Sequence, residues 1–437
     1  MNKWILVLAS FLTFFQVLRG QIEDWSITIL NPMPIATAYN TICEATVGAQ
    51  KFVYSFSGVK DELEIDSCHN RIFKYDVTAN SWSEINAEID TTQTLERRAV
   101  FINNRIYLMG GYYFDENNEM VVDGRNAVFN PFLDTLESFG SPLPTPVRGQ
   151  VSVKWRDSLI YVIGGLNSAG EYSTAVQIYD PFFNTWVQGE PLPNNDFFKH
   201  SGAAGHILGD TIYYFGGMTG SFVPETQGYL RKGVIDPNDP TSINWQFNEE
   251  IQLAKSYNAA CSGFGDKLFL FGGSRLAYDF DLTDTISGQL VFPRGELLNY
   301  LVIPKTNEAQ FPEKTQNAVF GIAQMGGGNW ITAGGVDSLG VISNRAFLLN
   351  NKDFSAISQA INPPFFQVNE TLDSYIVVTE NIGRIRIYDL AGNLLYNTSK
   401  GLSNLVVPKS DLPRNYLLFV YYDGANLPVV IRKVLVK

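Results

Sequence analysis

The sequence predicts an all-β protein in two parts, a six-bladed β-propeller followed by a small C-terminal β-sandwich. Three observations lead to this fold class. An apolar strand ending in Gly-Gly recurs at nearly constant spacing, the composition combines 13% aromatic residues with 37 Gly and 20 Pro, and the Gly-Gly pattern stops well before the end of the 437-residue chain. Such a composition is typical of many short strands joined by tight turns.

The first element is a predicted secretory signal over residues 1–20. An apolar run over residues 4–18 lies between Lys3 and Arg19, which matches the charged, apolar and small-residue regions of a signal. A membrane anchor is the alternative, but the run is shorter than the roughly 20 residues that span a bilayer. We therefore expect no stable membrane span after signal cleavage. Loss of Lys3 and Arg19 would change the net charge from −12 to −14.

Charge and cysteine content limit the partners and the covalent framework. A net charge of −12 repels phosphates, so we expect no nucleic-acid partner. Three cysteines, Cys43, Cys68 and Cys261, allow at most one disulfide and lack the spacing of a metal clip. We interpret them as buried free thiols, with one disulfide still open.

The propeller is predicted over residues 21–358 from six copies of one strand. The first Gly of the five clearer copies stands at 110, 164, 216, 272 and 334, so the steps are 54, 52, 56 and 62 residues. Such a period indicates stacked supersecondary units. The copies read IYLMGG, IYVIGG, IYYFGG, LFLFGG, the weaker WITAGG, and a degenerate VYSFSG that ends at Gly58.

The second half of each unit is predicted as a strand, a turn and an outer strand. Tyr179 and Trp186 lie seven residues apart on either side of an Asp-Pro turn, and Tyr75 and Trp82 repeat this spacing. Two segments compete to complete the last unit, residues 24–28 and residues 354–358. The sequence leaves that choice open.

These Gly-Gly strands and Tyr/Trp pairs resemble the kelch repeat family. The resemblance implies a ring of blades that must close, because each isolated unit exposes apolar faces and strand edges. Glycine after the second strand allows a positive φ and a close backbone approach. The aromatic residues are expected to fill the space between blades.

The C-terminal module is predicted over residues 359–437. It follows a break at Pro363-Pro364 and contains short alternating strands. The segment 385–395, with Leu412, Tyr416 and a basic ending, resembles the C-terminal sorting domain of the type IX secretion system of Bacteroidetes. One departure is Arg414-Asn415, where that family usually has Gly before the Tyr.

The alternative for this module is a generic β-sandwich or a carbohydrate-binding appendage. The sorting-domain resemblance implies export through the periplasm and outer membrane, with the outer-membrane secretion machinery as a partner. The expected localisation is then secreted or at the cell surface.

One candidate ligand site follows from the predicted topology. Residues at the starts of the inner strands are expected to meet at one mouth of the central channel, where propeller ligands usually bind. Arg and Tyr together suit an acidic sugar; the alternative is that these groups cap blades and bind water. The predicted site residues are Tyr39, Asn40, Arg97, Arg98, Arg148, His200, Tyr257 and Gln316.

The sequence gives little support for catalysis. Three histidines do not supply the copper ligands of a galactose oxidase type enzyme, and no Ser-His-Asp order, phosphate loop or zinc motif is present. The acidic segment Asp115–Glu119 lacks the glycine and glutamate of a calcium loop, so we expect a solvated hairpin. We expect no metal and no cofactor.

The leading function is a binding module for a glycan or a protein. The alternative is a carbohydrate-active propeller such as a sialic-acid mutarotase, which the resemblance to kelch propellers of that activity implies. Whether any catalysis occurs is left open.

Overall fold

A computed structural model describes most of the predicted propeller and the strands of the C-terminal module. The described ranges are 25–48, 50–87, 92–220, 224–252, 255–264, 267–281, 291, 296–301, 306–310, 316–337, 339–351, 366–370, 374–379, 384–389, 394–398, 404–412, 416–422 and 428–435. The predicted signal, the Pro363-Pro364 break and Arg414-Asn415 lie outside the described residues.

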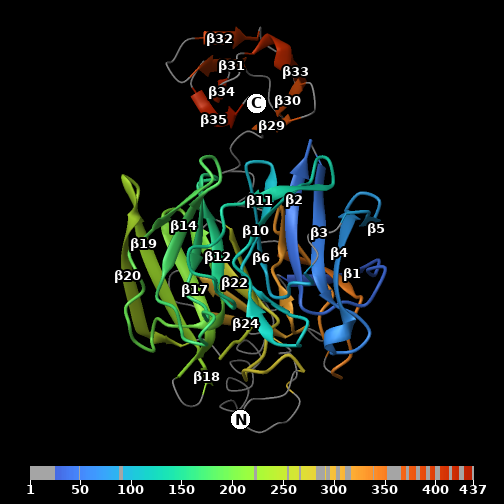
Figure 1. The fold of residues 1–437 in the computed structure, drawn as a ribbon, viewed down its shortest axis with the longest axis vertical. Coiled ribbons are helices and arrows are strands. Elements are labelled where there is room, and N and C mark those ends of the chain that lie inside the picture. Colours follow the sequence, from blue (N-terminus) through green and yellow to red (C-terminus); the bar gives the residue numbers. More distant parts are fainter. Residues whose placement is uncertain are drawn as a thin grey trace, which may run out of the picture.

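Residues 25–351 form an all-β propeller (Figure 1). Within the described residues it contains six sheets of four or five strands and one two-stranded sheet. Three sheets come from the first half: β2 (Asn40–Val47), β3 (Gln50–Val59), β4 (Cys68–Asp76) and β5 (Ser81–Ile85); β6 (Arg98–Ile102), β7 (Arg105–Met109), β10 (Asn126–Asn130) and β11 (Thr135–Gly140); β12 (Val151–Trp155), β13 (Leu159–Ile163), β14 (Val176–Asp180) and β15 (Thr185–Gln188).

The other three sheets follow the same plan. They are β16 (Ser201–Leu208), β17 (Thr211–Thr219), β19 (Tyr229–Asp236) and β20 (Asp239–Gln252), with β18 (Glu225–Thr226) beside β17; β21 (Ala260–Phe264), β22 (Lys267–Phe271), β23 (Glu296–Leu301) and β24 (Thr306–Gln310); and β26 (Ala323–Gly326), β27 (Asn329–Ala333), β28 (Ala346–Asn351) and β1 (Trp25–Leu30). Short β25 (Val319–Phe320) runs parallel to β2, and β8 (Tyr112–Phe114) with β9 (Met120–Val122) forms a hairpin.

The N-terminal strand completes the last sheet. β1 pairs antiparallel with β28, with Trp25 opposite Asn351 and Leu30 opposite Ala346. Of the two segments that compete for this place, the N-terminal one therefore pairs with β28. The competing segment, residues 354–358, lies outside the described residues.

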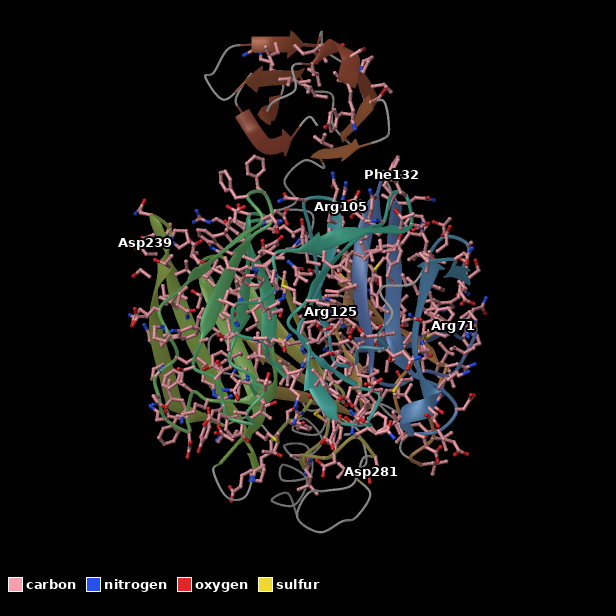
Figure 2. The ribbon with its side chains drawn as sticks, viewed as in Figure 1. Arg71, Arg105, Arg125, Phe132, Asp239 and Asp281 are labelled. Carbon is pink, nitrogen blue, oxygen red and sulfur yellow. The ribbon has the colours of Figure 1, made fainter. Side chains whose placement is uncertain are left out.

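The propeller has two unlike faces. On the turn face, neighbouring strands are joined by tight turns such as 77–80, 131–134 and 181–184. On the loop face, the second strand of each sheet ends at its Gly-Gly pair. The connections to the third strand are longer there, as in residues 60–67 and the β8–β9 hairpin. Figure 2 marks the two faces by Phe132 and Asp281, which lie at opposite ends of the propeller.

Aromatic side chains fill the space between neighbouring sheets. Tyr179 and Trp186 are cross-strand partners with ring centroids 4.8 Å apart, and Trp186 Nε1 donates to the Ser141 carbonyl of the preceding sheet at 2.8 Å. Tyr75 and Trp82 repeat the pairing at 5.0 Å. The predicted Tyr/Trp frame is therefore confirmed as inter-sheet packing.

The C-terminal module contains two antiparallel sheets among the described residues. One has the order β29 (Phe366–Glu370), β30 (Ser374–Thr379), β33 (Asn404–Pro408), and the other β32 (Leu394–Asn397), β31 (Arg384–Asp389), β34 (Tyr416–Tyr422), β35 (Pro428–Leu435). The described residues form only two short 3-10 turns, η1 (Ile65–Ser67) and η2 (Lys409–Asp411), besides strands. They contain no helix with the length and apolar character needed to cross a membrane.

Candidate functional site

A residue in the left-handed conformation lies at or just before the start of each inner strand. This residue has φ between 52° and 73° in all six sheets, although its type varies: Tyr39, Glu96, Gly149, Gly202, Asn258 and Ala318. Side chains other than Gly and Asn adopt this conformation at a cost. The repeated turn brings the starts of six strands together on the loop face.

The Gly-Gly pairs hold these starts in place. A Cβ on Gly111 would lie 2.1 Å from the Leu95 carbonyl oxygen of its own sheet, and a Cβ on Gly110 would lie 2.1 Å from Gln150 Nε2 of the next sheet. Both glycines have positive φ, +66° and +89° in chain order. The predicted reason for glycine, a positive φ and a close backbone approach, is confirmed.

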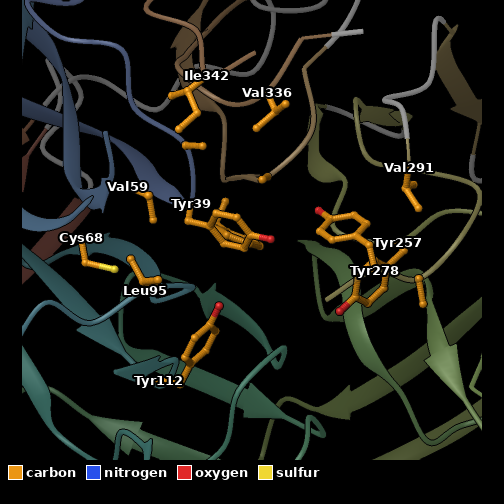
Figure 3. Close-up of a cluster of buried hydrophobic side chains, with 14 of the residues drawn as sticks. Tyr39, Val59, Cys68, Leu95, Tyr112, Tyr257, Tyr278, Val291, Val336 and Ile342 are labelled. Carbon is orange, nitrogen blue, oxygen red and sulfur yellow. The ribbon is translucent and has the colours of Figure 1, made fainter. Parts of the chain in front are cut away.

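Four tyrosines gather at the loop-face mouth, and we call Tyr39, Tyr112, Tyr257 and Tyr278 the mouth cluster (Figure 3). The Tyr39 hydroxyl donates to the carbonyl oxygens of Asp279 and Phe280, at 3.2 and 3.0 Å. Burial raises the pKa of all four hydroxyls, so they remain uncharged. The segment that contains Tyr278 and Phe280 therefore covers part of the mouth.

One buried acid lies beside the mouth cluster. Glu96 is 5% exposed, and burial raises the pKa of its carboxyl group while Arg148 and Arg98 act in the opposite direction. Arg148 lies over the Tyr112 ring, with its guanidinium carbon 5.7 Å from the ring centroid. The mouth thus combines one carboxyl group, the Arg148 guanidinium and several aromatic rings, with the Arg98 guanidinium further inside.

The structure brings together only half of the eight predicted site residues. Tyr39 and Tyr257 belong to the mouth cluster, Arg148 is half-buried beside it, and Arg98 lies further inside, on the wall of the central cavity. The remaining four, Asn40, Arg97, His200 and Gln316, are buried at the strand starts and are not part of the mouth cluster.

These four residues connect the starts of the inner strands to nearby strands and loops through an ion pair, hydrogen bonds or packing. Arg97 forms an ion pair of 2.8 Å with Asp123, with both side chains 2% exposed. Asn40 Nδ2 donates to Ser55 Oγ at 2.9 Å, and Gln316 Nε2 donates to Ser343 Oγ at 3.3 Å. His200 is fully buried against Gly164. Adjacent positions on a strand point to opposite sides, which explains why Arg97 and Arg98 separate.

Sequence reasoning missed Glu96, Tyr112 and Tyr278. Glu96 occupies the left-handed position equivalent to Tyr39, so aligning the strand starts on Tyr39 would have placed it at the mouth. Tyr112 directly follows the Gly111 of its Gly-Gly pair, a position that also faces the mouth in neighbouring sheets as Val59 and Leu166. Tyr278 lies in a connection without repeat character.

A cavity of about 160 Å³ lies inside the ring of inner strands. Residues from the inner strands of all six sheets line it, among them Arg98, Ser152, Ala204, Cys261 and Phe320. Toward the turn face its lining includes Glu44 and Lys154, and Lys154 is exposed. Burial, followed by Lys154, lowers the pKa of His206 to about 4, so this wall residue is neutral at pH 7.

The cysteines and acidic residues that the structure describes are not grouped as metal ligands. Cys43, Cys68 and Cys261 are all free thiols. The described residues contain no group of three His, Cys, Asp or Glu side chains that could hold a metal. The acidic segment forms the predicted hairpin, in which Asp115 Oδ1 accepts from the backbone N–H groups of Asn117 and Glu119, each at 2.9 Å.

Comparison with known proteins supports a kelch-repeat propeller. Residues 157–193 match the Kelch motif. Beta-scruin of Limulus polyphemus is 22% identical, and the match covers 62% of this chain and 29% of beta-scruin. The N-(sulfonatooxy)prop-2-enimidothioate sulfolyase of Thlaspi arvense is also 22% identical, and the match covers 51% of this chain and 66% of the sulfolyase. The chain therefore spans less than two thirds of these relatives.

A solved structure shares the fold. The structure of YjhT covers 80% of this chain and 99% of its own, with a TM-score of 0.58 and 13% sequence identity. At this identity the likeness concerns the fold alone.

Proposed function

We propose that this protein is an exported kelch-type propeller that acts as a binding module for a glycan or a protein at the cell surface. The observation that carries this proposal is the difference between the two faces. Long connections and a half-buried Arg148 gather on the loop face, whereas the turn face has tight turns. Loops held by a rigid scaffold are the usual place for ligand contacts.

We propose six blades over residues 21–358. Six sheets with the same strand order, and one cavity lined by the first strand of each, support a closed ring of six. β1 supplies the outer strand of the last blade. A cryo-EM or crystal structure of the purified protein tests the count; a ring of five or seven blades would refute it.

For residues 359–437 we propose a β-sandwich that serves as a sorting domain. Two antiparallel sheets of three and four strands support the sandwich, and β31 followed by β32 agrees with the strand-turn-strand of the sorting-domain resemblance. In a Bacteroidetes host, deletion of residues 359–437 should retain the propeller in the periplasm. Surface display without this segment would refute the proposal.

The same export route implies cleavage of residues 1–20. Mass spectrometry of the secreted protein should then find an N-terminus at Gln21. Retention of Met1 in the mature protein would favour a membrane anchor instead.

Among ligands, an acidic glycan fits the loop-face mouth best. Arg148 is half-buried over the ring of Tyr112, next to the partly buried Tyr172, so a guanidinium and aromatic rings face the same place. A glycan array probed with the whole protein should show binding to glycans that carry carboxylates. Arg148→Ala should abolish it, and Arg156→Ala on the turn face is the matched control. Binding that survives Arg148→Ala would remove this site.

A carbohydrate-active propeller is the second candidate, and Glu96 is the observation that favours it. A buried acid beside two guanidinium groups is an arrangement that can exchange a proton with a bound sugar. Interconversion of sialic-acid anomers, followed by NMR, tests this function. Acceleration that Glu96→Gln removes would support it, and a rate equal to that without protein would refute it.

A further inference from the structure

Three neighbouring tight turns of the turn face expose apolar side chains. They join the third and fourth strands of the first three sheets, and their exposed residues are Val77 at 40%, Leu133 at 48% and Phe183 at 57%. Phe132 and Phe182 are half-buried in the same turns, and Figure 2 shows Phe132 at this end of the propeller. We call these five residues the apolar tips.

The turns themselves do not require apolar residues. In the third sheet, Asp180 Oδ1 accepts from the backbone N–H groups of Phe182 and Phe183 at 2.8 and 3.1 Å. The fourth sheet forms the same bond around a polar residue, because Asp236 Oδ1 accepts from the Asn238 N–H at 2.9 Å. Single exposed apolar residues are ordinary, but their recurrence at one turn of three adjacent sheets indicates an interaction surface.

The chain leaves the propeller on the same face as the apolar tips. β28 is the third strand of its sheet and ends at Asn351, where β4, β10 and β14 of other sheets enter their tight turns. β1 takes the place of the fourth strand. The chain therefore continues from the turn face to β29, which begins at Phe366.

The C-terminal module can reach the apolar tips. Between Asn351 and Phe366 stand 14 residues, and an extended chain of that length spans at most about 50 Å. A compact domain of the propeller's length has a radius of gyration of about 20 Å, so the turns of the exit face lie within this span. Such a tether gives an effective concentration on the order of millimolar, at which weak apolar contacts are enough for docking.

Charge also favours the module as the occupant. Residues 21–358 contain 22 Lys and Arg against 38 Asp and Glu, a net charge of −16, whereas residues 359–437 contain 8 against 6, a net charge of +2. The two parts therefore attract each other, while two copies of the propeller repel. The module also exposes an apolar side chain on β33, where Val406 is 57% exposed and its neighbour Val407 is buried.

We infer that the C-terminal module docks on the apolar tips of the turn face, through the surface of β33 that carries Val406. The contact joins two parts of one chain. It leaves open the loop face, which carries the proposed ligand site. Docking requires neither the proposed ligand nor the proposed sorting role.

Small-angle X-ray scattering of the whole protein tests the contact. The docked protein should have a radius of gyration close to that of one compact body, about 22 Å for a chain of this length. Leu133→Asp combined with Phe183→Asp should raise it by about 3 Å, because a module attached only by the connecting segment lies further from the propeller. Asn238→Asp, at the equivalent turn of the fourth sheet, is the matched control and should leave it unchanged. An extended wild-type protein, or a double variant as compact as the wild type, would overturn the inference.

Variants of the module test the other side of the contact. Val406→Asp should produce the same increase in radius of gyration, whereas Leu395→Asp, on β32 of the other sheet, should not. Leu395 is 38% exposed, so both substitutions replace exposed side chains, and thermal unfolding checks that each variant is folded. An increase with Leu395→Asp alone would refute the assignment to β33.

Light scattering over a range of protein concentrations identifies a second copy as the occupant. The wild-type protein should keep the mass of one chain at every concentration. A mass that doubles in the wild type, but not in the double variant of Leu133 and Phe183, would assign the apolar tips to a dimer and contradict docking of the module.

Discussion

The chain reverses direction on both faces of the propeller, but the contacts that stabilise these reversals differ between the turn face and the loop face. On the turn face, Asp180 Oδ1 accepts from the backbone N–H of Phe182 at 2.8 Å, and Asn130 does the same for Phe132 at 2.9 Å. Contacts to the neighbouring sheet there are partly exposed, as in the ion pair of Lys74 and Asp134. On the loop face, strand starts depend on neighbours, as in the buried pair of Arg97 and Asp123. Because the loop-face pair is buried and the turn-face pairs are partly exposed, we expect the loss of a loop-face pair to cost more stability.

The largest effect is expected at Asp123, whose carboxylate accepts from Arg97 Nη2 and Arg125 Nε, each at 2.8 Å. Burial raises its pKa, but the two arginines outweigh burial and hold it at about 2. Asp123→Asn should lower the free energy of unfolding by about 3–5 kcal/mol, because buried positive charge is left uncompensated. Denaturant unfolding measures this.

The matched control for Asp123 is on the turn face. Asp210 pairs with Arg156 at 2.7 Å, with side chains 33% and 48% exposed. Asp210→Asn should cost no more than about 1 kcal/mol, as exposed pairs do. Similar losses for Asp123→Asn and Asp210→Asn would abolish the contrast between the faces.

The second prediction concerns the Gly-Gly pairs. Gly111→Ala should cost at least about 3 kcal/mol, because the new Cβ meets backbone atoms of Leu95 and Arg97 and the residue also has positive φ. Gly170→Ala has a similar φ of +74° but nothing within 4 Å, so about 1 kcal/mol is expected there. Thermal unfolding of both variants separates the clash from the φ penalty.

The third prediction uses the pH dependence of the loop face. His69 pairs with Gly58 across β3 and β4, and its Nδ1 accepts from the Arg71 backbone N–H at 3.3 Å. Burial, followed by Arg71 and Lys60, lowers its pKa to about 4 from 6.5. The unfolded chain then binds the extra proton more tightly, so stability is complete above pH 6.5 and falls as pH decreases toward 4.

The loss attributable to His69 reaches about 3 kcal/mol by pH 4. Denaturant unfolding at intervals between pH 7 and 4 measures it. His69→Gln should remove this share and reduce the slope, while the buried His206, whose pKa is also lowered to about 4, keeps part of the pH dependence. An unchanged slope in that variant would assign the acid sensitivity to other groups.

The smallest effect is expected in a turn. Asp180→Ala removes two hydrogen bonds to the backbone N–H groups of Phe182 and Phe183 and should cost about 1 kcal/mol. Asp180→Asn keeps the acceptor oxygen and should cost less. A loss in Asp180→Ala as large as that in Gly111→Ala would show that turns contribute as much as the loop-face contacts.

Local patterns predicted the strands well. The Gly-Gly copies mark β7, β13, β17, β22 and β27, and the seven-residue Tyr/Trp spacing located two cross-strand pairs. These features repeat because each sheet meets the same neighbours. A repeated contact leaves a repeated residue type, which a single sequence displays.

The candidate site was predicted less well because it does not repeat. The left-handed position is Gly in two sheets but Tyr, Glu, Asn or Ala in the others, so residue type does not mark it. Arg97 and Arg98 are neighbours with opposite orientations, and a one-residue shift of register exchanges their roles. Tyr278 reaches the mouth from an irregular connection, which periodicity cannot place.

The pairing of β1 with β28 has a consequence for how the chain folds. The two strands are separated by more than 300 residues of sequence, so their hydrogen bonds form only after the intervening sheets are in place. Until then both strands present unpaired edges, which can pair with other chains. We expect folding to end with this step, and a peptide copy of residues 25–30 added during refolding to compete with it. The last contact to form is then also the one that removes these edges from the reach of other chains.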